Sequence, residues 1–192
     1  MSRTRNRAAT SYARPSAGEL AAARGKRLRD VIGSELKVLF CGINPGLYSA
    51  ATGNHFARPG NRFWPALHAA GFTPRRFYPA EKEAFLRLGY GLTNLVARAT
   101  ASADELAPAE FVAGRARLAR KVRHHRPRVV AFLGMGAYRH AFDEPRAPLG
   151  AQPRHFGGAR VWVLPSPSGL NAGYPMGALV AALRKLKRAL RA

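Results

Sequence analysis

Residues 38–46 read VLFCGINPG, and this stretch decides the fold. The run from Val38 to Ile43 is apolar and uncharged, with the length of a strand buried on both faces. It breaks at Asn44-Pro45-Gly46, residue types that set turns rather than continue a strand. Ligands bind at the carboxyl ends of strands in open α/β sheets, so we expect Asn44 to point into a site. Taken alone, the tripeptide is also compatible with a plain turn.

Further short apolar runs predict three more strands, at residues 91–96, 128–134 and 160–164. Helical patterns separate them, and the last helix carries leucines at helical spacing at positions 179, 183, 186 and 190. Residues 143–158 have neither pattern and are expected to be irregular. The alternation predicts an α/β fold, a three-layer sandwich in which helices cover both faces of a central, mostly parallel sheet of four to five strands.

The composition is compatible with one folded domain, since the chain has 192 residues of which 47% are hydrophobic. Residues 1–34 are rich in arginine, with few residues that could form a core. We expect a flexible basic arm over 1–34, with a helical patch within 17–30, and a folded domain over 35–192, which the family resemblance described below implies is catalytic. The arm is either a DNA tether or a solvated tail.

The charge balance points to a polyanionic partner. Lysine and arginine number 32 against 10 acidic residues, which gives a net charge of +22. Nucleic acid is the first candidate and an anionic membrane surface the second. No apolar stretch approaches the ~20 residues of a membrane span, and the N-terminus lacks a signal-peptide core. We therefore expect a cytoplasmic, DNA-associated protein, without a membrane partner and monomeric.

The sequence offers no metal or cofactor site. Cys41 is the sole cysteine, so neither a disulfide within the chain nor an iron–sulfur cluster can form. The six histidines show no short ligand pattern. We expect no metal and no cofactor.

A second loop makes the turn at Asn44 more informative. Residues 164–171 read LPSPSGLN after another apolar run, and residues 61–64 read NRFW. With GINPGL, these motifs resemble the mismatch-specific uracil/thymine DNA glycosylase family in order and spacing, from about Lys37 onward. The resemblance implies a monofunctional enzyme of base excision repair. It would flip a mismatched or damaged pyrimidine out of double-stranded DNA, with no metal, and hydrolyse its N-glycosidic bond.

The resemblance also implies roles for the residues around the first loop. Asn44 would hold the attacking water, because an amide oxygen accepts a hydrogen bond but is a negligible base. The base pocket would comprise Ile43, Gly46, Ser49, Phe56 and Asn94. Phe56 would stack on the extruded base, or else be ordinary core. Asn94 would read the uracil edge, or else tie down a neighbouring loop.

The second loop would supply a wedge made of Ser168, Gly169, Leu170 and Asn171. Leu170 would fill the gap left in the base stack, although it could instead be a buried anchor of the loop. The main uracil glycosylase family has a histidine where Ser166 stands here, and a tyrosine where Gly46 stands. The resemblance therefore implies a slower enzyme with a pocket open beside C5 of the base.

Asp104 is a possible catalytic carboxylate. The segment from Ser102 to Glu105 fits a capping box, although the helix could start near Pro108 instead. Helix capping is the favoured role of Asp104, and activation of a water or stabilisation of a sugar cation is the alternative.

Two other functions are compatible with parts of the sequence. A non-catalytic basic nucleic-acid-binding α/β domain would explain the charge but not the two loops. A nucleotide-binding enzyme would use Gly134-Met135-Gly136, yet it lacks the fuller glycine-rich fingerprint and its lysine.

Overall fold

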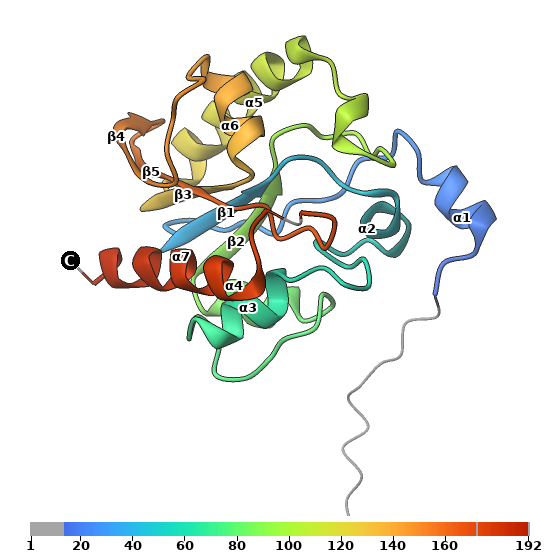
Figure 1. Ribbon diagram of the computed structural model, residues 1–192, viewed down its shortest axis with the longest axis horizontal. Coiled ribbons are helices and arrows are strands. Elements are labelled where there is room, and N and C mark those ends of the chain that lie inside the picture. The colour runs from blue at the N-terminus through green and yellow to red at the C-terminus, as the bar shows by residue number, and fades with distance from the viewer. Residues whose placement is uncertain (1–13, 172, 192) are drawn as a thin grey trace, which may run out of the picture.

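A central sheet of five strands organises the computed structural model, which describes residues 14–171 and 173–191 (Figure 1). The strand order is β2-β1-β3-β5-β4. The strands are β1 (Val38–Gly42), β2 (Tyr90–Asn94), β3 (Val129–Leu133), β4 (Gly150–Phe156) and β5 (Ala159–Leu164). All neighbouring pairs are parallel except β4 with β5. The predicted α/β fold with a mostly parallel sheet is confirmed.

Helices cover both faces of the sheet (Figure 1). One layer contains α3 (Phe63–Ala69), α4 (Lys82–Arg87) and α7 (Met176–Ala189), and the other contains α5 (Pro108–His125) and α6 (Met135–Phe142). Side chains of β1 alternate between the two cores: Val38 and Phe40 pack with the first layer, whereas Leu39 and Cys41 pack with the second. This alternation explains why β1 is apolar at every position.

The strand register aligns the ends of the strands. Gly42 of β1 lies beside Asn94 of β2, and Leu133 of β3 lies beside Leu164 of β5. The loops that follow these strands therefore emerge at one edge of the sheet, as the two unusual loop motifs predicted.

The edge strand β4 corrects the expectation that residues 143–158 are irregular. Its sequence, GAQPRHF, is mostly exposed and lacks the apolar alternation that announces a strand. It pairs with β5 across a turn at Gly157-Gly158, where both glycines have positive φ. The pairing is imposed by the neighbouring strand rather than by the residues of β4.

The segment before β1 also differs from its expected form. A capping box at Ser16 starts α1 (Ala17–Ala22), shorter than the expected helical patch, and the chain then runs along the outer edge of β2. Val31 and Leu92 exchange both backbone hydrogen bonds, and Val31 joins the core. The structure therefore departs from the expected flexible arm over residues 14–34, while residues 1–13 lie outside the described part.

Within the described residues, no helix is both long and apolar enough to cross a membrane.

Candidate active site

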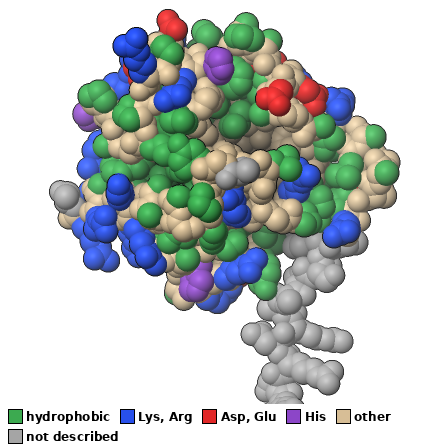
Figure 2. All heavy atoms as spheres, in the orientation of Figure 1, with side chains coloured by type: hydrophobic (Ala, Val, Ile, Leu, Met, Phe, Trp, Pro, Cys, Tyr) green, Lys and Arg blue, Asp and Glu red, His purple; other side chains and the backbone are tan. Residues whose placement is uncertain are grey.

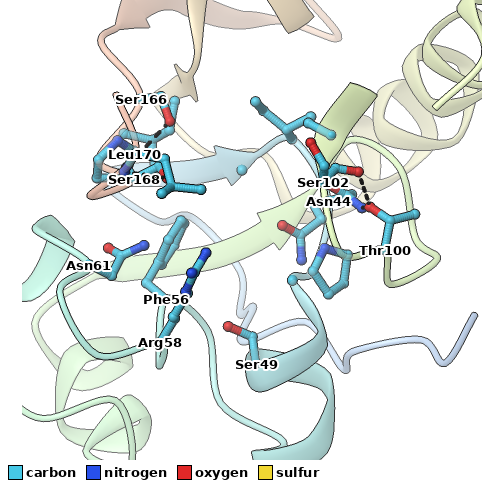
Figure 3. Close-up of a pocket in the computed structure, with 18 of the residues that line it drawn as sticks. Asn44, Ser49, Phe56, Arg58, Asn61, Thr100, Ser102, Ser166, Ser168 and Leu170 are labelled. Atoms are coloured by element: carbon cyan, nitrogen blue, oxygen red, sulfur yellow. Dashed lines mark hydrogen bonds between the residues drawn. The ribbon is translucent and has the colours of Figure 1, made fainter. Parts of the chain in front are cut away.

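A pocket of about 390 Å³ lies at the carboxyl ends of β1 and β2 (Figure 3). Both loop motifs line it, together with Leu28 from the segment before β1. The structure brings nearly all of the predicted site residues to this pocket: Ile43, Asn44, Gly46, Ser49, Phe56, Asn94, Asp104, Ser168, Leu170 and Asn171. Gly169 lies in the same loop as the last three without lining the cavity.

The side-chain amide of Asn44 is held in one orientation. Its Nδ2 donates to the backbone oxygen of Arg98 at 3.1 Å and to Oγ1 of Thr100 at 2.6 Å. The Thr100 hydroxyl donates its own proton to the backbone oxygen of Ser102 at 2.6 Å, so it can only accept from Asn44 (Figure 3). Both protons of the amide are therefore used, and Oδ1 is left to accept a hydrogen bond from a group in the pocket.

Thr100 orients the Asn44 amide and was not predicted from the sequence. It is 1% exposed and is brought beside the first loop by a bridge between its backbone and that of Gly46. Nothing in its local sequence marks it, because its partner lies 56 residues away along the chain.

Asn94 has an amide free for a ligand. No side-chain hydrogen bond joins it to another residue within the described ranges, although it is partly buried. Its Oδ1 lies over Gly42, where a Cβ atom would come within 2.6 Å of that oxygen and 3.3 Å of Cζ of Phe56. Glycine at position 42 thus allows the close approach of the Asn94 amide and the Phe56 ring.

Phe56 packs against the core and also lines the pocket. Its ring stacks on Phe63 of the core, with centroids 4.1 Å apart and planes at 28°. It also lines the pocket, and its φ of +54° places a non-glycine residue in the left-handed region. Such a conformation costs on the order of 1 kcal/mol and is retained only where the surroundings hold it.

Ser49 and Gly46 occupy different parts of the wall. Ser49 is buried and its Oγ accepts from the backbone N–H of Ala57 at 3.2 Å, so it ties α2 (Leu47–Thr52) to the loop that carries Phe56. Gly46 precedes α2 and is exposed, with no atom within 4 Å of where a Cβ would lie.

His55 lines the pocket and was not predicted from the sequence. Its Nε2 lies 2.9 Å from the backbone oxygen of Arg29, and burial lowers its pKa. The imidazole is therefore neutral at pH 7, and it ties the segment before β1 to the wall of the pocket.

Asp104 lies on the exposed rim of the pocket. Ser102 caps a 3₁₀ turn at Ala103–Glu105 and α5 begins separately at Pro108, so both of the helix starts considered exist. Oδ2 of Asp104 accepts from Oγ of Ser102 at 3.0 Å, and Glu105 completes the capping box. Asp104 is thus part of the capped turn and still borders the pocket.

The second loop presents an exposed apolar side chain. Leu170 is 74% exposed, which differs from the alternative of a buried anchor. The loop is close to the segment before α3, since a Cβ on Gly169 would lie 2.8 Å from the backbone oxygen of Gly60. Asn171 does not extend outward: its Nδ2 donates to the backbone oxygen of Ser166 at 3.1 Å and closes the loop.

Charged side chains of both signs lie at this site, since Arg58 and Asp104 both line the pocket. Figure 2 shows lysine and arginine side chains over much of the visible face, with acidic side chains gathered in a few places.

Cys41 is buried and its pKa is raised by burial. Across residues 14–171 and 173–191, no group of three or more His, Cys, Asp or Glu side chains is placed to hold a metal ion.

Comparisons with known proteins identify the family and the fold of the chain. The family model described as the uracil DNA glycosylase superfamily matches residues 29–190. Among solved structures, the chain is similar to that of a candidate uracil DNA glycosylase from Methanosarcina acetivorans, determined in solution by NMR. The two are 18% identical with a TM-score of 0.54, over 85% of this chain and 98% of the other. At that identity the likeness establishes the shared fold.

Proposed function

Because the chain belongs to the uracil DNA glycosylase superfamily, we propose that it is a monofunctional DNA glycosylase of the mismatch-specific kind. Its substrate is a mispaired or damaged pyrimidine in double-stranded DNA, with uracil opposite guanine processed best. The observation that carries the proposal is the Asn44 amide, whose nitrogen is fully bonded and whose oxygen is left for a water.

Asn44 fits the requirements of hydrolysis at C1′. The C1′–N1 bond breaks as the base leaves as an anion, and a water forms the new C1′–O bond and finally gives up a proton. Oδ1 of Asn44 would accept a hydrogen bond from that water and hold it below the sugar, which avoids the entropic cost of ordering it during the reaction. An amide does not remove the proton, so the reaction depends on the sugar becoming cationic before the water attacks.

Phe56 and Asn94 fit the requirements of base binding. The Phe56 ring is fixed against Phe63 on one side, so its pocket side can support a flipped base by stacking. Asn94 carries an amide donor and an acceptor that match N3–H and a carbonyl of uracil.

Gly46 and Ser166 bear on substrate range and rate. The space around Gly46 is open, so a 5-substituted or etheno base would meet no side chain there. Gly46 and Ser166 both line the pocket. Ser166 has no imidazole that could stabilise the leaving base. The lability of a mispaired or damaged base would then contribute to selectivity.

The proposal is tested by single-turnover excision on duplexes with uracil opposite guanine, compared with a panel of 5-substituted and etheno lesions. Asn44→Ala should lose at least ~100-fold in rate and keep its affinity for DNA, since an uncharged amide contributes little to binding of the phosphate backbone. Arg87→Gln removes an exposed charge on α4 and serves as the control. A chain that binds these duplexes without leaving abasic sites would instead be a non-catalytic DNA-binding domain.

A further inference from the structure

We propose that Arg62 is a positioning residue that locks the wedge loop, residues 166–171 and 173–174, to the start of α3. The inference rests on the proposed function in one respect, namely that Leu170 enters the duplex. Arg62 lies in the NRFW motif at residues 61–64, and the family resemblance did not imply a role for it.

The guanidinium of Arg62 collects backbone carbonyls of the wedge loop. Its Nη1 donates to the oxygen of Tyr174 at 2.5 Å, and its Nη2 donates to the oxygens of Ser168 at 2.6 Å and Asn171 at 3.0 Å. The backbone N–H of Arg62 donates to the oxygen of Pro167 at 2.9 Å. One residue therefore holds the loop at four points, two of which flank Gly169-Leu170 at its tip.

Within the described residues, the hydrogen bonds of Arg62 go to carbonyl oxygens of the wedge loop and not to a carboxylate. No salt bridge joins Arg62 to a carboxylate within the described part of the chain, and its Nε is buried without a partner there. Burying part of a guanidinium against neutral carbonyls carries a desolvation cost that several charge-assisted hydrogen bonds offset. The planar fork of arginine can reach divergent carbonyls at once, which a lysine ammonium cannot do in the same way.

The wedge loop has little else to fix it. Leu170, the large apolar side chain at its tip, is exposed and contributes nothing to either core. The remaining ties within the loop are short-range, such as the bonds from the backbone N–H groups of Leu170 and Asn171 to Ser168. Without Arg62 the tip would depend on those bonds and on the contact between Gly169 and Gly60.

Arg62 also links the wedge to the base pocket. The next residue, Phe63, stacks on Phe56, which lines the pocket. The base platform and the wedge are therefore held by consecutive residues at the start of α3, which fixes the spacing between them. A wedge that is ordered in advance pays less conformational entropy when it enters DNA.

Hydrogen exchange of the wedge loop tests the lock without any reference to activity. Arg62→Gln should speed exchange of the Leu170 and Asn171 amides by at least ~10-fold, the scale of one lost charge-assisted bond, and leave β1 unchanged. Arg62→Lys should fall between Arg62→Gln and the unmodified protein. Gly169→Ala is an independent variant, because its new Cβ would push the loop off Gly60 with Arg62 intact, and it should act in the same direction. Arg87→Gln is the control for charge.

A second readout follows the wedge itself. The unmodified protein should prefer a duplex with a tetrahydrofuran abasic analogue over an intact duplex, because the gap accepts Leu170. Arg62→Gln should lose most of this preference, and combining it with Leu170→Ala should lose no more than Leu170→Ala alone. Excision from single strands should fall less in Arg62→Gln than excision from duplexes does, since a single strand has no gap to fill.

The two proposals fail in different ways. The role of Arg62 would be overturned if Arg62→Gln and Gly169→Ala changed neither the hydrogen exchange of the wedge loop nor the preference for the abasic duplex. The glycosylase proposal would not be affected by that result. Additive losses in the Arg62 and Leu170 double variant would likewise overturn the role of Arg62, because Arg62 would then act independently of the wedge. A protein that excises nothing but whose loop loosens in Arg62→Gln would sink the glycosylase proposal alone.

Discussion

Replacing Thr100 by valine should slow base excision by releasing the Asn44 amide. Valine keeps the shape of this buried side chain but removes the oxygen that accepts from Nδ2 of Asn44 at 2.6 Å. The bond from Nδ2 to the Arg98 carbonyl remains, so the amide is loosened rather than freed. A hydrogen bond of this kind contributes about 0.5–1.5 kcal/mol, which corresponds to a rate loss of about 2- to 13-fold.

The assay is single-turnover excision from a duplex with uracil opposite guanine, with enzyme in excess so that product release does not limit the rate. Thr100→Ser keeps the hydroxyl and is the matched control, with a rate within ~2-fold of the unmodified protein because the hydrogen-bond pair is preserved. Thermal unfolding of all three proteins separates a local effect from loss of fold. Equal rates for the valine and serine variants would refute the reasoning, because the orientation of Asn44 would then not depend on the hydroxyl.

Two of the three further predictions concern the pocket and its rim, and the third concerns the ion pair of Arg98 with Glu110. Gly46→Tyr should narrow the substrate range toward uracil, because the open space beside α2 would hold a ring; unchanged excision of 5-substituted bases in a lesion panel would count against this. Asp104→Asn should alter the excision rate by less than ~3-fold if Asp104 serves only in the capped turn, whereas a loss near ~100-fold would assign it to acid–base catalysis. The side chain of Arg98 is the main cause that lowers the pKa of Glu110 from its ordinary value of 4.5 to about 2. The ionised Glu110 therefore stabilises the fold at pH values above 4.5, and this stabilisation is lost as the pH falls toward 2. Glu110→Gln should therefore flatten the decline in stability between those pH values, as measured by urea unfolding, and an unchanged decline would mean that other carboxylates cause it.

Local sequence was sufficient to predict four of the five strands and the meeting of the two loops that line the candidate site. Apolar runs of strand length need no distant partner to be recognised, and Asn44-Pro45-Gly46 ends its strand through the conformational preferences of its own residues. Because parallel strands end at one edge, the sequence also predicted that the first loop and the loop of Leu170 would meet. Net charge follows from composition alone.

Tertiary structure decided what holds these residues in place. The β4 strand and the segment at Val31 pair because an unpaired strand edge lies beside them, and their own residues carry no strong signal for it. Thr100 and Arg62 act on atoms 56 and more than 100 residues away along the chain. The distant partners of Arg62 are backbone carbonyls, which every residue possesses, so no residue type at the far end marks the contact. Sequence alone can therefore name candidate groups for contact with a substrate, while the groups that orient them emerge only when the chain is folded.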